Sequence, residues 1–222
     1  MNQEFLNRIT NADYSDIIDK IEDKSIDLLL TDPPYGVIGN LSNCKWDDID
    51  IISFTKNWYE RIKSKMKDNS STFIFWSQKY LKEGLEIFNP NRILIWHHPN
   101  LAKPTNKMFL WTYDPILFIK NGKPIFNASF VKKENVDIFR YAKPQNNYKK
   151  DKRYHLTSKP IELIKLFVKI STKENDLVVD IFSGGSPVAV ACKLMNRNFI
   201  CIEKEKNYCE ISEQRLKEME AM

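Results

Sequence analysis

Short apolar runs of strand length alternate along the chain with segments of helical periodicity. The apolar runs predict strands at 26–31, 71–76, 92–96, 113–119, 177–182 and 198–203. The periodic segments predict helices at 51–66, 78–88, 160–170, 187–195 and 207–219. This alternation is typical of a mainly parallel, twisted sheet with helices on both faces, so we expect an α/β, Rossmann-like fold. At 222 residues, the chain has the length of a single domain, 1–222.

One segment, 120–158, departs from this alternation and is dominated by Asn, Lys, Pro and Tyr. We interpret it as a long functional excursion rather than as part of the core. Between Asn127 and Ser158 it holds eight basic and three acidic residues, an excess equal to the +5 net charge of the whole chain. A local excess of this kind favours a polyanionic partner, although a solvated surface loop is the alternative. The candidate phosphate-binding residues are Lys132, Lys133, Arg140, Lys143, Lys149, Lys150, Lys152 and Arg153.

The sequence also indicates the cellular setting. No apolar run approaches the length of a membrane span, and the first ten residues are polar and mixed in charge, unlike a signal peptide. The four cysteines have no CxxC spacing, which suits reduced thiols. We therefore expect a cytoplasmic protein that does not bind membranes.

A first chemical motif, Asp32-Pro33-Pro34-Tyr35, directly follows a predicted buried strand. An exocyclic amine on a base is a poor nucleophile because its lone pair is conjugated with the ring. The Asp32 carboxylate and the Pro33 carbonyl, both hydrogen-bond acceptors, could hold the two N–H groups and draw the lone pair out of conjugation. Consecutive prolines lack backbone donors and leave carbonyls free, and Tyr35 offers a flat face for a flipped base. The structural alternative is a tight turn capped by Asp32.

A second motif, Asp180-Ile181-Phe182-Ser183-Gly184-Gly185, joins a predicted strand to a helix. Glycines in such a loop allow a ligand to approach the backbone closely, and ligands of open α/β sheets bind at the carboxyl ends of strands. No Lys-Ser/Thr pair follows the glycines, so the loop is not a P-loop. Glu203 ends the next strand, where a carboxylate suits ribose hydroxyls, although it could equally be a solvated strand end.

Together the two motifs resemble the amino-methyltransferase family of DNA modification enzymes, which act on N6 of adenine or N4 of cytosine. Because Asp32-Pro33-Pro34-Tyr35 precedes the glycine loop, the chain resembles the circularly permuted β group of that family. The resemblance implies S-adenosyl-L-methionine as cofactor and double-stranded DNA as partner, with target recognition carried by 97–158. A homodimer and a cognate restriction endonuclease are compatible with it.

The resemblance also implies roles for the cofactor-binding residues. Asp13 would bind the adenine amine of the cofactor, and Phe182 would lie against its adenosine. Asp180 would take the methionine ammonium. The segment Thr157-Ser158-Lys159-Pro160, at a helix start, would lie near the methionine carboxylate, where Lys159 and the helix N-terminus both favour negative charge.

The glycine loop departs from the family pattern, which usually reads Phe-x-Gly-Ser-Gly-Thr. Here Ser186 replaces the second glycine of that pattern, and Pro187 replaces the threonine. Proline suits the first turn of a helix, whereas Ser186 would be strained if the site requires a positive φ. Cofactor affinity is the property that this departure bears on.

His97 and His98 follow a predicted strand but have no further ligands at metal spacing, so we predict no metal site and place these histidines in a loop near the DNA. The leading functional hypothesis is direct methyl transfer to N6 of adenine. Cytosine-N4 methylation is the alternative, since its motif more often begins with Ser than with Asp. A catalytically weak DNA-binding protein on the same scaffold is a third hypothesis, and RNA or protein acceptors stay open.

Overall fold

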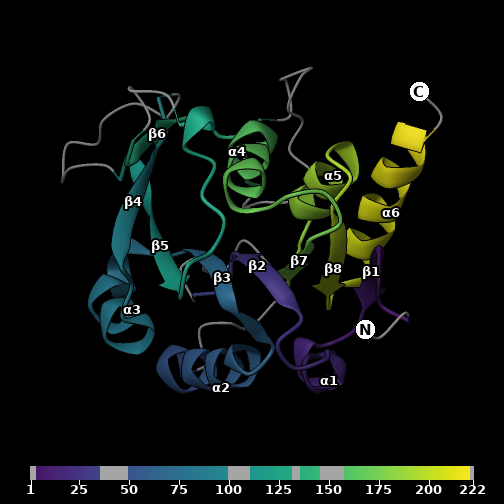
Figure 1. Cartoon of the computed structure of the whole chain (residues 1–222), viewed down its shortest axis with the longest axis horizontal. Helices are drawn as coiled ribbons and strands as arrows, with labels where there is room; N and C mark the ends of the chain where they lie inside the picture. Colours follow the sequence, from purple (N-terminus) through teal and green to yellow (C-terminus); the bar gives the residue numbers. More distant parts are fainter. Residues whose placement is uncertain (1–3, 36–49, 100–110, 132–135, 146–157, 221–222) are drawn as a thin grey trace.

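Eight strands form one mixed sheet in the computed structural model, which describes residues 4–35, 50–99, 111–131, 136–145 and 158–220. The strand order is β1-β8-β7-β2-β3-β5-β4-β6 (Figure 1). The pairs from β1 to β3 are parallel, β5 runs antiparallel to both of its neighbours, and β6 is parallel to β4. The strands span Arg8–Asn11 (β1), Ile26–Thr31 (β2), Met66–Phe75 (β3), Arg92–His97 (β4), Tyr113–Asn121 (β5), Ile138–Arg140 (β6), Leu177–Asp180 (β7) and Asn198–Glu203 (β8).

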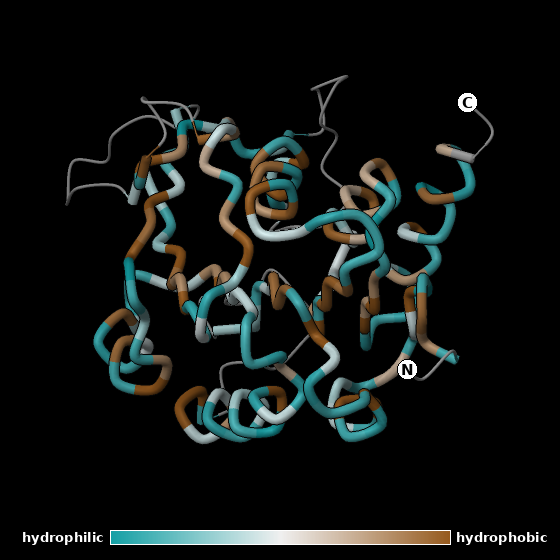
Figure 2. Tube along the Cα trace, in the orientation of Figure 1, coloured by the Kyte–Doolittle hydropathy of each residue, from teal (hydrophilic) through white to brown (hydrophobic). Residues whose placement is uncertain are grey.

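Helices cover both faces of this sheet. The first layer holds α1 (Tyr14–Ile17), α2 (Ile51–Lys63) and α3 (Leu81–Phe88), and the second holds α4 (Ile161–Ser171), α5 (Pro187–Leu194) and α6 (Lys206–Glu220) (Figure 1). Short 3-10 turns lie at Ile18–Lys20 (η1), Gln78–Tyr80 (η4) and Ala128–Phe130 (η5). Each layer encloses its own apolar cluster against the sheet, and hydrophobic positions follow the central strands (Figure 2). None of the helices in the described part of the chain is both long and apolar enough to cross a membrane.

The predicted α/β, Rossmann-like fold is confirmed, and the predicted strands and helices are present with shifted ends. The sequence missed β1 and β6, which are only four and three residues long. The prediction that 120–158 lies outside the core is wrong at β6, because Phe139 is buried and packs against Phe167 of α4 at a ring distance of 5.2 Å. A three-residue strand has one inward side chain, so the sequence shows no alternation of apolar and polar positions from which the strand could be predicted.

The strand order determines where ligands can bind. β7 and β2 are adjacent and parallel, with Leu28 opposite Val178 and Leu29 opposite Val179. Their carboxyl ends, which carry the two predicted motifs, therefore meet at one edge of the sheet, where open α/β sheets bind ligands.

Candidate active site

The two predicted motifs are joined by a buried hydrogen bond. Thr31, the last residue of β2, donates from its hydroxyl to Oδ1 of Asp180, the last residue of β7, at 2.8 Å. A cavity of about 430 Å³ opens beside this contact. It is lined by every predicted catalytic and cofactor-binding residue that the structure describes, whereas Thr157 lies outside the described residues. The lining includes Asp13, Asp32, Pro33, Pro34, Tyr35, Ser158, Lys159, Asp180, Phe182, Ser183, Gly184, Gly185 and Glu203.

Asp180 is a buried carboxyl group at the centre of this cavity. Burial raises its pKa to about 7, and hydrogen bonds from Thr31 and from the backbone of Phe182 oppose that rise. Both of these bonds end on Oδ1, which leaves Oδ2 as the oxygen that can meet a ligand. A cationic ligand group here would restore the charged carboxylate, since an opposite charge offsets desolvation.

The loop after β7 has a left-handed backbone at two positions. Gly184 has φ 49°, and Ser186, the N-cap of α5, has φ 48° with ψ 51°. Ser186 is buried; its backbone N–H donates to the carbonyl of Ser183 at 2.6 Å, and its hydroxyl to the Ser183 hydroxyl at 3.0 Å. Position 186 therefore does require a positive φ, as the family glycine suggested, and serine adopts it at a steric cost. Pro187 begins α5, as predicted.

Glu203 supports the loop as well as lining the cavity. Its Oε2 accepts a hydrogen bond from the N–H of Gly184 at 2.7 Å, and its Oε1 accepts one from Glu205 at 2.8 Å. Burial raises the pKa of Glu203, and these backbone bonds oppose the rise. A carboxylate oxygen has a second lone pair, so Glu203 can hold the loop and also accept from a ribose hydroxyl.

Aromatic rings form one end of the cavity. The Phe182 ring lies 5.2 Å from Tyr14 of α1 and 5.8 Å from Phe54 of α2, with Trp58 packed against it at 5.7 Å. Tyr14 and Phe54 line the cavity, and the sequence reasoning missed both. Tyr14 could have been noticed as the neighbour of Asp13, whereas Phe54 belongs to an ordinary amphipathic pattern. A flat heterocycle fits such a set of rings.

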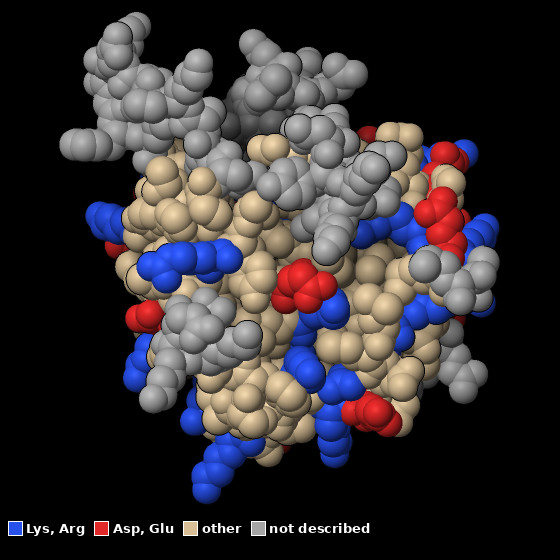
Figure 3. All heavy atoms as spheres, turned by 90° about the horizontal axis from the view of Figure 1, so that it is seen from above, with Lys and Arg blue, Asp and Glu red and all other residues tan. Residues whose placement is uncertain are grey.

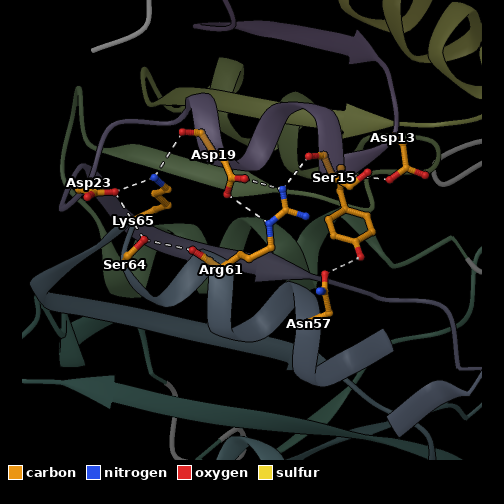
Figure 4. A network of polar contacts seen from close by, with 9 residues as sticks. Asp13, Ser15, Asp19, Asp23, Asn57, Arg61, Ser64 and Lys65 are labelled. Atoms are coloured by element: carbon orange, nitrogen blue, oxygen red, sulfur yellow. Dashed lines mark hydrogen bonds and ion pairs between the residues drawn. The ribbon is translucent and has the colours of Figure 1, made fainter. Parts of the chain in front are cut away.

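A polar network fixes this aromatic end from outside (Figure 4). Arg61 of α2 donates to the carbonyl of Ser15 at 2.6 Å and forms two hydrogen bonds with Asp19. The N–H of Ser15 in turn donates to Asp13 at 3.0 Å, and Lys204 forms an ion pair with Asp13, also at 3.0 Å. Burial raises the pKa of Asp13, but Ser15 and Lys204 together lower it by more than burial raises it, so the net shift is downward. Asp13 is thus held as a carboxylate that caps α1 at the wall of the cavity.

Asp32, which also lines the cavity, meets two donors of its own chain. The Tyr35 hydroxyl donates to Oδ1 at 2.6 Å, and the Lys159 ammonium donates to Oδ2 in an ion pair. Tyr35 packs edge-on against Trp76 at 5.7 Å, and burial, followed by the charge of Asp32, raises its pKa well above the ordinary value. The structure therefore brings Lys159 to Asp32, the predicted catalytic carboxylate, a contact that the predicted role at the methionine carboxylate did not include.

Of the predicted phosphate-binding residues, only Arg140 and Lys143 belong to the described chain; Lys132, Lys133, Lys149, Lys150, Lys152 and Arg153 lie outside it. Arg140 is exposed at the end of β6. Lys143 turns inward, with its ammonium 3.6 Å from Asp114 and 5.5 Å from the centre of the Trp96 ring. On the face in Figure 3, the described basic side chains are spread out and interrupted by acidic ones.

The prediction of a loop is wrong for His97 but not for His98, which follows β4, and nearness to DNA stays a prediction. His97 is the last residue of β4, and His98 is buried, its ring 4.4 Å from that of Trp96. Burial lowers the pKa of His98, whereas Asp114, with an oxygen 3.2 Å from Nε2, opposes that shift. Within the described residues, no group of three or more His, Cys, Asp or Glu side chains is arranged to hold a metal ion.

The cavity thus combines a group of aromatic rings, the buried carboxyl groups of Asp180 and Glu203, and the carboxylate of Asp32. Fold and site together define an α/β protein that binds a nucleoside with a charged tail beside a group able to hold an amine.

The chain belongs to the DNA methylase family, whose family model matches residues 26–214. It is 29% identical to the Type II methyltransferase M2.MboI of Moraxella bovis, over 92% of this chain and 85% of that protein. It is 26% identical to the Type II methyltransferase M.HinfI of Haemophilus influenzae, over 97% of this chain and 70% of that protein. The predicted family is confirmed.

Solved structures agree with this assignment. The M1.HpyAVI–SAM complex superposes with a TM-score of 0.74 at 25% identity, covering 94% of this chain and 98% of that one. The cytosine-N4-specific PvuII DNA methyltransferase superposes with a TM-score of 0.78 at 16% identity, covering 94% and 87%, and shows the shared fold.

Proposed function

We propose that this chain transfers a methyl group from S-adenosyl-L-methionine to N6 of adenine in duplex DNA. The observation that carries the proposal is the position of Asp32, an acceptor carboxylate at the end of β2 that shares one cavity with the nucleoside-binding residues. Aspartate at this position favours adenine, whereas serine more often begins the motif of cytosine-N4 enzymes.

The described residues fit the cofactor along its length. The rings of Tyr14, Phe54 and Phe182 suit the adenine, Glu203 suits the ribose and Asp180 suits the ammonium. When bound, the cofactor supplies a methyl group on a positively charged sulfur. M1.HpyAVI was solved as a complex with SAM, which supports the same ligand here.

The protein's part in the transfer is to hold the target amine. Asp32 and the carbonyl of Pro33 accept hydrogen bonds from the two N–H groups, and the ring of Tyr35 stacks on the flipped base. The nitrogen lone pair forms the new bond to the methyl carbon, and the electrons of the carbon–sulfur bond remain with sulfur. The proton lost from nitrogen passes by way of Asp32 to solvent. No covalent bond to the protein is required.

The deciding experiment incubates native protein and Asp32→Ala with unmethylated DNA and labelled S-adenosylmethionine, followed by mass spectrometry of the nucleosides. N6-methyladenine from the native chain, lost in the variant, supports the proposal. N4-methylcytosine would transfer the assignment to the alternative base. Cofactor binding without DNA methylation would indicate another acceptor, and absence of cofactor binding would indicate the catalytically weak scaffold. A homodimer and a restriction partner stay predictions.

A further inference from the structure

A second acidic side chain, Asp114, lies behind the catalytic edge and outside the cavity lining. It is on β5, directly opposite Trp96 in the antiparallel register with β4. Its Oδ2 lies 3.2 Å from Nε2 of His98 and 3.6 Å from the ammonium of Lys143, and its side chain is 26% exposed. Two side chains from separate segments therefore lie against the carboxylate.

Asp114 shares an aromatic wall with Lys159, through the Trp96 ring. The Lys159 ammonium lies 5.0 Å from the centre of the Phe75 ring and 5.9 Å from that of Trp96, and Lys143 lies 5.5 Å from the same Trp96 ring. Buried aromatic faces favour ammonium groups at such distances. The wall thus brings Lys159, which contacts Asp32, within electrostatic range of Asp114.

The titration behaviour of Asp114 agrees with this placement. Burial raises the pKa of Asp114, but contact with His98 and then the charges of Lys159 and Lys143 lower it by more than burial raises it. The net shift of the pKa is downward, so the group is ionised. Burial lowers the pKa of His98, which leaves the imidazole neutral. The negative charge of Asp114 also contributes, after burial and Asp32, to the raised pKa of Tyr35. Asp114 therefore acts on both donors that occupy Asp32.

The amine of the target base competes with those donors for the oxygens of Asp32. The target amine must donate to Asp32, yet one oxygen accepts from Tyr35 and the other from Lys159. The side chain of Lys159 is only 6% exposed, and a buried ammonium that loses its counter-charge is strongly destabilised. A second carboxylate within electrostatic range would remove much of that cost.

We propose that Asp114 is a positioning residue for methyl transfer, supplying the counter-charge for Lys159 when the amine of the target base displaces Lys159 from Asp32. The inference rests on the proposed function, because it concerns the same transfer. It assigns Asp114 no contact with the base or with the cofactor.

The test compares Asp114→Asn with Asp114→Glu in single-turnover methylation of duplex DNA at saturating S-adenosylmethionine. Asparagine keeps the size and an acceptor for His98 but removes the charge. We expect a transfer rate on the order of tenfold lower, with the Kd for cofactor and the Kd for DNA within about twofold of native. The glutamate variant should recover most of the rate. Glu174→Gln, which removes the charge of an exposed acid in the turn before β7, is the matched control and should transfer at the native rate.

A native transfer rate in Asp114→Asn would overturn the inference and leave Lys159 to be held by the cofactor carboxylate alone. Equal losses in the asparagine and glutamate variants would also overturn it, since the charge would then not be the property that matters. If the native protein methylates no DNA, the proposed function fails, and this inference fails with it. If the native protein methylates DNA and Asp114→Asn does so at the native rate, only this inference fails. The two failures are therefore distinguishable.

Discussion

Tyr35 donates its hydroxyl hydrogen to Oδ1 of Asp32 at 2.6 Å, while its ring packs against Trp76. The hydroxyl and the ring of Tyr35 therefore make separate contacts and can be tested separately. The hydroxyl donates to Asp32, the proposed catalytic carboxylate, and would leave it or share it when an amine of the target base binds. The ring is the flat surface on which a flipped base would stack.

Replacing Tyr35 by phenylalanine tests this separation. We expect Tyr35→Phe to keep kcat/KM within about threefold of native, because the stacking face remains, and Tyr35→Ala to lose about 10- to 100-fold, the effect of losing one base–aromatic stack. Steady-state methylation of a duplex oligonucleotide measures both. If phenylalanine were as damaging as alanine, the hydroxyl rather than the ring would be essential.

Asp180 gives a prediction about protons. Its pKa is raised to about 7 by burial, so at pH 6 the free protein carries this carboxyl mostly protonated. Binding of the cofactor ammonium should convert it to a carboxylate and release about one proton at pH 6. Calorimetric titration in buffers of different ionisation enthalpy measures that release. Asp180→Asn should bind more weakly and release none from this site; native binding without proton release would argue against the ammonium contact.

The same pKa predicts a pH dependence of stability. Because the folded pKa is raised, the stability contribution of Asp180 is full below about pH 4 and is lost as the pH rises towards 7. Asp180→Asn should therefore gain stability relative to the native protein between pH 4 and pH 8. Urea unfolding at both pH values checks this. A difference that does not change with pH would contradict the raised pKa.

How far the sequence alone defines this site depends on how local each signal is. Asp32 and Asp180 were found because each follows a buried apolar run, and a parallel sheet brings such strand ends together. The contact between Lys159 and Asp32 spans 127 residues and has no local pattern, so only the fold shows it. Phe54 and Asp114 were missed for the same reason: one is an ordinary helix residue and the other an ordinary strand residue until their neighbours are known.

Ser186 is a case in which the family pattern pointed to strain before the backbone was known. With φ 48°, the residue adopts a conformation that costs a side-chain-bearing residue about 1–2 kcal/mol relative to glycine. Ser186→Gly and Ser186→Ala both lose the hydrogen bond between the hydroxyls of Ser186 and Ser183. The difference between their free energies of unfolding therefore reports the backbone strain at this position. We expect the glycine variant to be about 1 kcal/mol more stable than the alanine variant. Denaturant unfolding measures the difference, and an alanine variant of equal stability would contradict a strained backbone at this position.

Two arginines at opposite ends of neighbouring strands can test from which side of the sheet DNA approaches. Arg140 ends β6 and pairs in register with His97 at the carboxyl end of β4, whereas Arg92 begins β4. β4 is antiparallel to β5, which is antiparallel to β3, so the carboxyl end of β4 lies on the same side of the sheet as the ends of β2 and β3. Arg140 is thus on the catalytic side and Arg92 on the opposite side.

A phosphate contact by Arg140 would appear in the salt dependence of DNA binding. Each neutralised phosphate contributes a slope of about −0.9 to log K against log salt, so Arg140→Ala should reduce the slope by about one unit. Arg92→Ala removes the same charge and should leave the slope unchanged. Fluorescence anisotropy with duplex DNA at several salt concentrations measures both. If the two variants behaved alike, net charge alone would account for the attraction, and DNA would have no preferred approach along the catalytic side at Arg140.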